Sequence, residues 1–219
     1  SNLPSSHGRK VRQWTIQNYD LSGQMLDEIS MFDVFLKNDL HGMLYMSSIT
    51  NGGPSVDGDT LHLNDVETFP DDLDSEIFAP GDLLVSLRNT NTIMVFDRNS
   101  YDIKFIKSGS FVRQHDPDFI QGDKISVFDN RNFSLPNGAQ ASRVVEVEAI
   151  SGNVTSILDE NSQRPFFTDI MGNHQRLENG NILVVASQEG RVMEYLANGD
   201  LAWRYDHRVK PMRNMRNIF

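Results

Sequence analysis

A loosely repeated unit of short strands constrains the fold of this 219-residue chain more than any other feature. Each unit reads as a run of β-branched and aromatic residues, a polar turn, a second run, a turn rich in Gly or Asn, and a third run. Short runs bounded by turn residues are typical of antiparallel strands. Three segments follow this plan: Leu83–Ile106, Ile125–Leu158 and Ile182–Tyr205.

A histidine precedes each of these units, separated from the first apolar run by a turn rich in Gly, Asp or Asn. The three are His62, His115 and His174. Their recurrence indicates a fourth strand in each unit, which carries the histidine. Four strands at a spacing of roughly 40 to 60 residues are typical of a propeller blade. The predicted fold class is therefore all-β, a β-propeller of four-stranded blades.

About four to five blades are visible in the chain by this strand pattern. Residues 14–19 followed by 21–24 resemble the last two strands of a blade, and residues 42–46 are expected to be the strand that starts another blade. No long segment keeps the 3.6-residue period of a helix.

The predicted domain organisation is simple. Residues 11–206 are expected to form the blades, after an N-terminal tail of residues 1–10. Residues 207–219 are basic and lack a strand pattern, so they are interpreted as a C-terminal tail or the start of a further segment.

Composition excludes several classes of function. The net charge of −10 argues against a nucleic-acid groove, because phosphate binding requires a clustered basic face. The absence of cysteine excludes disulfides, thiolate catalysis and cysteine-ligated zinc. No apolar run approaches the length of a transmembrane segment, and no signal peptide is visible. Assembly into a homo-oligomer is compatible with the sequence.

The three histidines form the first candidate site. The first strand of each propeller blade lines the central channel, so His62, His115 and His174 are expected to face one cavity. A lone histidine on a strand is more often a hydrogen-bonded structural residue, but three at equivalent positions favour a shared site. His7 and the two other histidines lack this equivalence and are interpreted as surface or packing residues.

Arginine and asparagine residues near the strand ends add a second element. The guanidinium groups of Arg88, Arg131 and Arg143 offer forked donors that match a tetrahedral oxyanion such as sulfate or phosphate. The alternative for each is a salt bridge to a neighbouring blade. Asn64 and Asn130 could orient a histidine or donate to an oxyanion, and they could equally cap turns.

Several segments together resemble the arylsulfate sulfotransferase family, in order and over roughly residues 57 to 206. They are Asp59-Thr60-Leu61-His62-Leu63-Asn64-Asp65-Val66-Glu67, Gly81-Asp82-Leu83-Leu84-Val85-Ser86-Leu87-Arg88-Asn89, Gln114-His115-Asp116-Pro117-Asp118-Phe119, Val127-Phe128-Asp129-Asn130, Ala141-Ser142-Arg143-Val144-Val145-Glu146 and Gln175-Arg176-Leu177-Glu178-Asn179-Gly180-Asn181.

The resemblance implies a six-bladed propeller that moves a sulfuryl group from an aryl sulfate donor to a phenolic acceptor. It implies no nucleotide sulfate carrier and no cofactor, and a histidine that takes the group covalently. His174 matches the nucleophile, and His62 and His115 match histidines that bind sulfate or assist proton transfer. Pro117 departs from the family pattern, in which some members carry Asn. Membership also points to the bacterial periplasm or the cell surface.

In this interpretation a neutral imidazole is a competent nucleophile near pH 7, and cations compensate charge on the sulfuryl oxygens. The residues expected to bind the sulfate group are Arg88, Asn64, Arg143 and Asn130. No metal is required.

Two alternatives remain open. One is a metal-assisted propeller hydrolase that uses His62, Asn64, Asp65 or Asp118 as ligands, although these lack a tight spacing signature. The other is a propeller without catalysis that serves as a binding or interaction module.

Overall fold

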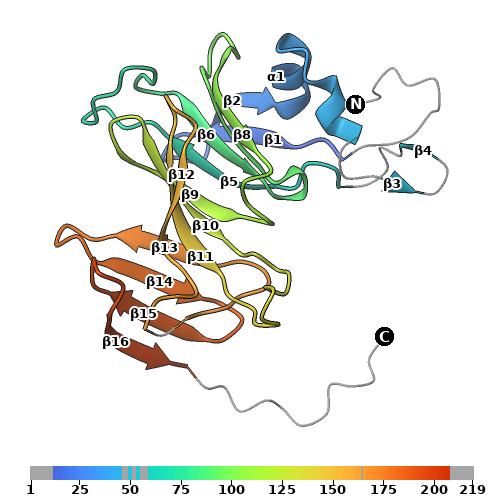
Figure 1. Ribbon diagram of the computed structural model, residues 1–219. Coiled ribbons are helices and arrows are strands. Elements are labelled where there is room, and N and C mark those ends of the chain that lie inside the picture. Colours follow the sequence, from blue (N-terminus) through green and yellow to red (C-terminus); the bar gives the residue numbers. More distant parts are fainter. Residues whose placement is uncertain (1–11, 46–48, 51–52, 55–58, 164, 208–219) are drawn as a thin grey trace.

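Three four-stranded antiparallel sheets follow one another along the chain in this computed structural model (Figure 1). The structure describes residues 12–45, 49–50, 53–54, 59–163 and 165–207. The predicted tail of residues 1–10, and all of the predicted C-terminal segment except His207, lie outside these residues.

Each sheet is a meander in which every strand pairs with the next one along the chain. The first sheet contains β5 (Leu63–Thr68), β6 (Leu83–Leu87), β7 (Thr92–Phe96) and β8 (Ile103–Ser108). The second contains β9 (His115–Gln121), β10 (Lys124–Asp129), β11 (Arg143–Glu148) and β12 (Val154–Leu158). The third contains β13 (Asn173–Arg176), β14 (Ile182–Ala186), β15 (Arg191–Tyr195) and β16 (Leu201–Asp206).

These strands confirm the all-β class and the four-stranded unit. The second, third and fourth strands of each sheet fall on the predicted runs, because those runs are apolar and are bounded by Gly, Asn and Asp turns. Every residue of β6 and of β7 is buried, and so is every residue of β10 except Lys124. Such strands read in the sequence as continuous apolar runs.

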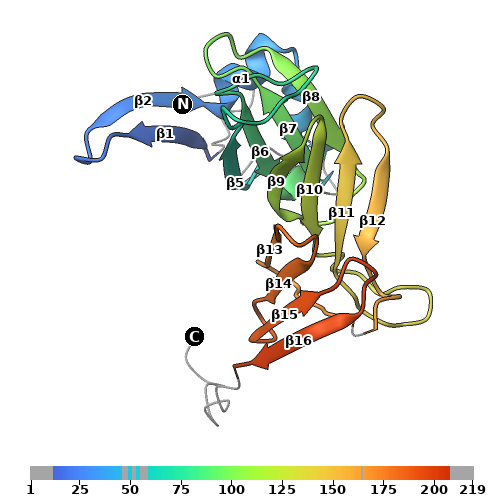
Figure 2. The same cartoon turned by 90° about the vertical axis from the view of Figure 1, so that its left-hand side faces the viewer.

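A two-stranded hairpin precedes the sheets. β1 (Thr15–Tyr19) pairs antiparallel with β2 (Met25–Ser30). The first of the two predicted strands is confirmed, but residues 21–24, the predicted second strand, form the turn between β1 and β2. The hairpin projects beside the first sheet in Figure 2. A second and much shorter pair joins β3 (Ile49–Thr50) to β4 (Gly53–Pro54).

The strand expected at residues 42–46 is wrong. Residues His41–Tyr45 form a 3₁₀ helix, η1, and it follows a seven-residue α-helix, α1 (Met31–Lys37), that the sequence pattern missed. The buried side chains of α1 lie at helical spacing, from Met31 and Phe32 to Val34 and Phe35. About two turns of helix are too short for the helical period to be recognised, and a short apolar run does not separate strand from helix.

Aromatic side chains fill the spaces between neighbouring sheets. Phe69, Phe78 and Phe119 pack edge to face or tilted between the first two sheets, with ring centroids 4.9 to 5.8 Å apart. Phe128 and Phe166 pack between the second and third sheets. Burial of large apolar rings is the main source of stability here, at about 1.5–3 kcal/mol for each side chain.

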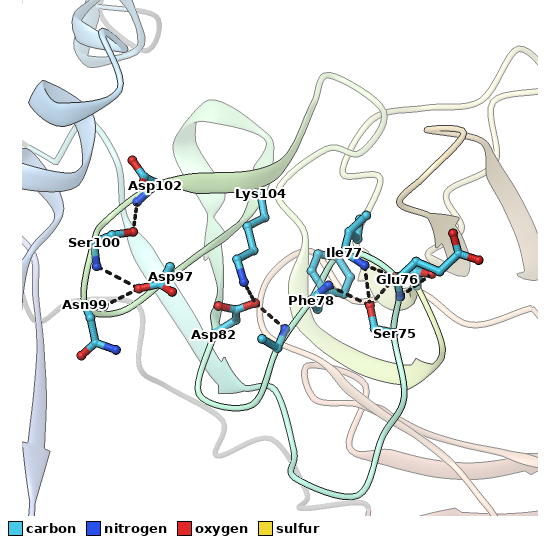
Figure 3. A network of polar contacts seen from close by, with 12 residues as sticks. Ser75, Glu76, Ile77, Phe78, Asp82, Asp97, Asn99, Ser100, Asp102 and Lys104 are labelled. Atoms are coloured by element: carbon cyan, nitrogen blue, oxygen red, sulfur yellow. Dashed lines mark hydrogen bonds and ion pairs between the residues drawn. The ribbon is translucent and has the colours of Figure 1, made fainter.

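Polar turns fix the loops of the first sheet (Figure 3). The buried carboxylate of Asp82 accepts hydrogen bonds from the Ala79 backbone N–H and from Lys104 Nζ, each at 2.7 Å. In the β7–β8 turn, Asp97 accepts backbone N–H groups, as does the Ser75 hydroxyl before β6. The Gly81–Asp82 turn that marks the sequence unit is therefore also a polar anchor.

The first strands of the three sheets lie next to one another. β9 contacts β5 on one side and β13 on the other, and in Figure 2 these strands face the concave side of an open arc. The fourth strands, β8, β12 and β16, lie on the opposite side of the arc. Side chains that point inward from the first strands are thereby brought together. No helix in the described part of the chain is long and apolar enough to cross a membrane.

Candidate functional site

The three histidines lie at or beside the first strands, but at different depths. His62 immediately precedes β5, and its carbonyl accepts the backbone N–H of Arg88, one residue beyond β6. His115 opens β9 opposite Phe128, the penultimate residue of β10. His174 pairs with Val184, two residues before the end of β14. Each histidine therefore lies at or beside the first strand of its sheet, as expected. The three do not lie at the same level along those strands.

The side chain of His115 is held by Asn130. Asn130 Nδ2 donates to the carbonyl oxygens of Thr168 and Met171, at 2.9 and 2.7 Å, so Asn130 Oδ1 is the atom that faces the imidazole. His115 Nδ1 lies 2.8 Å from this oxygen and 3.0 Å from the carbonyl oxygen of Arg113. Both partners only accept, so Nδ1 carries the proton and Nε2 presents a lone pair.

Cations surround His115. Burial, followed by the charges of Arg88 and His62, lowers the pKa of His115 below its usual value of 6.5, against hydrogen bonds that raise it. Arg88 forms no ion pair with any described residue, and burial and the charge of Arg113 lower its own pKa. Arg113 likewise has no carboxylate partner among the residues that the structure describes. Within the described residues, Arg88 therefore lies near His115 without an ion pair, although the charge of Asp59 also acts on it, and Arg113 lies near Arg88.

His62 belongs to a separate polar triad. Its Nδ1 contacts the carboxylate of Asp59, and Trp14 Nε1 donates to the other oxygen of that carboxylate at 2.8 Å. Burial raises the pKa of Asp59, but the hydrogen bonds from His62 and Trp14 outweigh it and hold the pKa below its usual value. The ring of Trp14 lies 5.7 Å from that of His62, between centroids. The carboxylate thus orients the imidazole of His62.

Buried amides connect the first two sheets at this point. Gln114 is fully buried, and its Nε2 donates to Ser86 Oγ and to the Thr92 carbonyl, at 3.0 and 2.9 Å. Asn64 Nδ2 donates to the Gln114 carbonyl at 2.9 Å. Asn64 therefore holds the segment that carries His115, instead of lying free for a ligand through its amide nitrogen.

Three residues of the site have left-handed backbone conformations. His62, Arg113 and Asp116 have φ values of 51°, 56° and 51°. Such angles are uncommon for residues other than glycine and gather at functional sites. They also aim side chains in directions that strand alternation does not give. The sequence offered no signal for Arg113, because a single exposed arginine before a strand has no pattern.

His174 lies in different surroundings. Its ring is fully buried, and Asp116 Oδ2 accepts from its backbone N–H at 2.5 Å and from Nδ1 at 2.9 Å. Asn173 also contacts this carboxylate. No described hydrogen bond or ion pair joins His174 to His62 or to His115.

Carboxylates gather on the same side as His174. Burial, and then the charge of Asp116, raises the pKa of Asp65 to about 7 and that of Asp118 to about 8. The same two causes raise the pKa of Glu67. Asp116, Asp118 and His174 each offer a ligand atom, and these atoms lie within 4.8 Å of one another.

A cavity of about 610 Å³ opens beside this group. Its lining includes Glu67, Asp118, Glu146 and His174, but not His62 or His115. That all three histidines face one cavity stays a prediction. The first strands carry two neighbouring sites of opposite charge: a cationic group around His115 and an anionic group around His174.

The other predicted arginines are engaged within the fold. Arg143 Nε pairs with the buried carboxylate of Asp129 at 2.8 Å, and its Nη atoms donate to Ser156 and Ser110. Arg131 pairs with Glu160 at 2.6 Å. For both, the geometry matches the salt-bridge alternative and leaves the cationic group to Arg88 and Arg113.

Comparison with known proteins gives one family. A model of the family described as arylsulfotransferase (ASST) matches residues 4–208. No curated protein matches the chain. Among solved structures, a protein of unknown function from Bacteroides caccae is similar, with 13% sequence identity and a TM-score of 0.41 over 84% of this chain. The chain spans about half, 51%, of the length of that structure.

Proposed function

The chain belongs to the arylsulfotransferase (ASST) family, and from this premise we propose that it transfers a sulfuryl group from an aryl sulfate to a phenol. The substrates are small molecules, and the group passes through a covalent histidine intermediate. One observation carries the proposal: His115 presents the lone pair of Nε2 near Arg88, which forms no ion pair with any described residue.

His115 is the proposed nucleophile. Its proton is held on Nδ1 by Asn130, and the lowered pKa keeps Nε2 unprotonated near neutral pH. His174, which the family resemblance suggested, has a fully buried ring with carboxylates beside it. A sulfate monoester is an anion, and the charge of Asp116 would oppose its approach to that ring.

Arg88 and Arg113 are the proposed sulfate-binding groups. Guanidinium groups donate in a fork that matches the oxygens of a sulfuryl group, and they keep their charge at any working pH. Because neither is neutralised by a described carboxylate, binding of the substrate anion would satisfy both. Asn64 and Asn130 position His115, and Arg143 supports the second sheet.

The reaction balances with two histidines. His115 Nε2 attacks sulfur, the bond between sulfur and the aryl oxygen breaks, and the electron pair leaves with the phenolate. Protonated His62 donates its proton to that oxygen, with Asp59 stabilising the imidazolium. The acceptor phenol then gives its proton to His62 and attacks sulfur, which breaks the S–N bond and returns the electron pair to Nε2.

We also propose that the three sheets are blades of a propeller extending over residues 11–206. The meander order and the adjacent first strands support this arrangement. Action in the periplasm or outside the cell fits the family, since aryl sulfates and phenols reach such compartments without a nucleotide carrier.

The test is an incubation with 4-nitrophenyl sulfate, with and without phenol, followed by peptide mapping under conditions that preserve sulfohistidine. We expect phenol-dependent release of nitrophenolate and a sulfuryl group on His115. Release that does not require phenol would indicate a sulfatase. The absence of both release and label would favour a binding module.

Matched histidine variants identify the nucleophile. His115→Ala should abolish label and turnover, whereas His174→Asn should keep the label on His115. A label on His174 in the wild-type protein would refute the assignment of His115.

A further inference from the structure

The Nε2 atom of His174 is a buried ring nitrogen without a hydrogen-bond partner among the residues that the structure describes. The residue is 3% exposed. A buried polar atom without a partner costs about 1–3 kcal/mol, so an isolated nitrogen at this place is unfavourable. The proposed sulfuryl transfer leaves this nitrogen without a role.

Asp116 determines which ring nitrogen carries the proton. A carboxylate accepts hydrogen bonds, and Asp116 Oδ2 lies 2.9 Å from His174 Nδ1. Nδ1 therefore donates, and Nε2 presents its lone pair on the far side of the ring. A histidine with one nitrogen bonded to a carboxylate and a lone pair on the other has the second-shell arrangement of metal-binding histidines.

Asp118 lies on the side to which Nε2 points. Its Oδ2 is 3.8 Å from Nε2, which is too long for a hydrogen bond. Two ligands at about 2.1 Å from a tetrahedral ion lie about 3.4 Å apart, so a small side-chain rotation brings these atoms to metal-binding distance. Asp65 and Glu67 act electrostatically on Asp118 and add negative charge around it.

We propose that His174 Nε2 and Asp118 Oδ2 bind a divalent transition-metal ion, with Asp116 orienting the imidazole. The combination of imidazole and carboxylate favours an ion such as Zn²⁺, whereas Ca²⁺ and Mg²⁺ prefer oxygen ligands alone. The cavity beside Asp118 and His174 leaves room for water at the remaining coordination positions.

The ion would join two sheets. Asp118 belongs to β9 of the second sheet and His174 to β13 of the third. A metal that bridges them binds the folded protein more tightly than the unfolded chain, so it raises the midpoint of thermal unfolding. The proposed ligands are distinct from the residues assigned to sulfuryl transfer.

The experiment is titration of the EDTA-treated and dialysed full chain with ZnCl₂, by calorimetry and by thermal unfolding. We expect one zinc ion per chain and a higher unfolding midpoint, with CaCl₂ and MgCl₂ giving neither at the same concentration. His174→Asn keeps a donor near the place of Nδ1 and removes Nε2, and Asp118→Asn removes the charged ligand. Each variant should weaken zinc binding at least tenfold.

His41→Ala is the matched control. His41 is an exposed histidine whose Nδ1 lies 3.5 Å from Asp39, so it offers an imidazole and a carboxylate on the surface. The variant should bind zinc as the wild type does, and so should His115→Ala, which separates this site from the proposed transferase site. Absence of zinc binding, or equal affinity in the wild type and in both ligand variants, would overturn the proposal.

Discussion

The Nδ1 atom of His115 donates to Oδ1 of Asn130 over 2.8 Å, and the direction of this bond is set by groups on the far side of Asn130. Because Asn130 Nδ2 is occupied by the carbonyl groups of Thr168 and Met171, its oxygen must face the ring. The backbone before β13 thereby determines the tautomer of a histidine on β9.

Asn130→Ala tests this relationship. His115 must be neutral to attack, so kcat/KM should rise with pH through its pKa, with the acid limb below pH 6.5. The bond from Asn130 raises that pKa, so its loss should move the limb to still lower pH. We expect kcat to fall about 10- to 100-fold as the ring loses its orientation. The pH profile of kcat/KM measures the shift.

The same variant should be less stable by about 1–3 kcal/mol, because the carbonyl groups of Thr168 and Met171 lose the hydrogen bonds from Asn130 Nδ2. Urea unfolding measures this loss. Asn161→Ala, on the exposed surface, is the control and should change neither quantity. An unchanged acid limb in Asn130→Ala would show that Asn130 does not set the protonation of His115.

Arg88→Gln separates substrate binding from stability. Arg88 has no described carboxylate partner, so its loss should change the free energy of unfolding by less than about 1 kcal/mol. Loss of a cation beside the reacting group should reduce kcat/KM about 10²- to 10³-fold. Steady-state kinetics and urea unfolding of the same preparation provide both numbers.

Arg143→Gln should behave in the opposite way. It leaves the carboxylate of Asp129, which is 1% exposed, without its ion pair. Breaking a buried pair in this way costs about 3 kcal/mol or more. We expect lower stability and nearly wild-type kcat/KM for the folded fraction. Wild-type stability, together with a loss of kcat/KM as large as that of Arg88→Gln, would indicate that Arg143 binds the sulfate group.

The sequence predicted the sheets well and the site less well, for a physical reason. Strand runs and turn residues are local signals, so β6, β7 and β10 could be located from the pattern of residues along the chain. The depth of each histidine depends on strand register, and register follows from turns and packing that the pattern does not encode. His174 consequently lies among carboxylates while His115 lies among cations.

The backbone conformations and long-range contacts of individual site residues also could not be predicted from the sequence pattern. Arg113 has a left-handed backbone conformation, and nothing in the neighbouring residue types requires it. The partnership of Asp116 with His174 crosses from one sheet to the next over 58 positions of the chain. Such contacts become visible only once the sheets are placed side by side.

Asp65→Asn should change how stability depends on pH. In EDTA, the folded protein binds a proton at Asp65 with a pKa of about 7, against the usual value of 3.8. Its contribution to stability is complete below pH 3.8, falls as pH rises from 3.8 to about 7, and is fully lost above that pH. The variant lacks this loss, so it should be more stable than the wild type by roughly 1–3 kcal/mol at pH 8.

Urea unfolding at pH 5 and pH 8 measures this difference. The gap between variant and wild type should widen as pH increases. Asp72→Asn, at an exposed position before β6, serves as the control. A gap that stays constant between the two pH values would contradict the raised pKa of Asp65.

Gly172→Ala should destabilise the start of β13. Gly172 has a φ of 108°, and a Cβ there would lie 2.5 Å from Cε1 of Phe128. Backbone strain and overlap with a buried ring should together cost about 3 kcal/mol or more.

Gly199→Ala isolates the backbone part of that cost, since Gly199 has a φ of 85° and open space around its Cβ position. This control should lose only about 1 kcal/mol in thermal or urea unfolding. Equal losses in the two variants would show that the Phe128 ring moves aside without penalty.

The buried amide of Gln114 has a mechanical consequence. Arg88 follows the first sheet, whereas His115 and Asn130 belong to the second, and Gln114 ties the two sheets to each other between them. The groups proposed to react therefore meet at the contact between two sheets and not within one rigid element. Any change in the angle between the sheets alters the separation of the imidazole and the guanidinium. The rigidity of the contact between the two sheets, and not the stability of either sheet alone, therefore determines how well the His115 imidazole and the Arg88 guanidinium stay aligned.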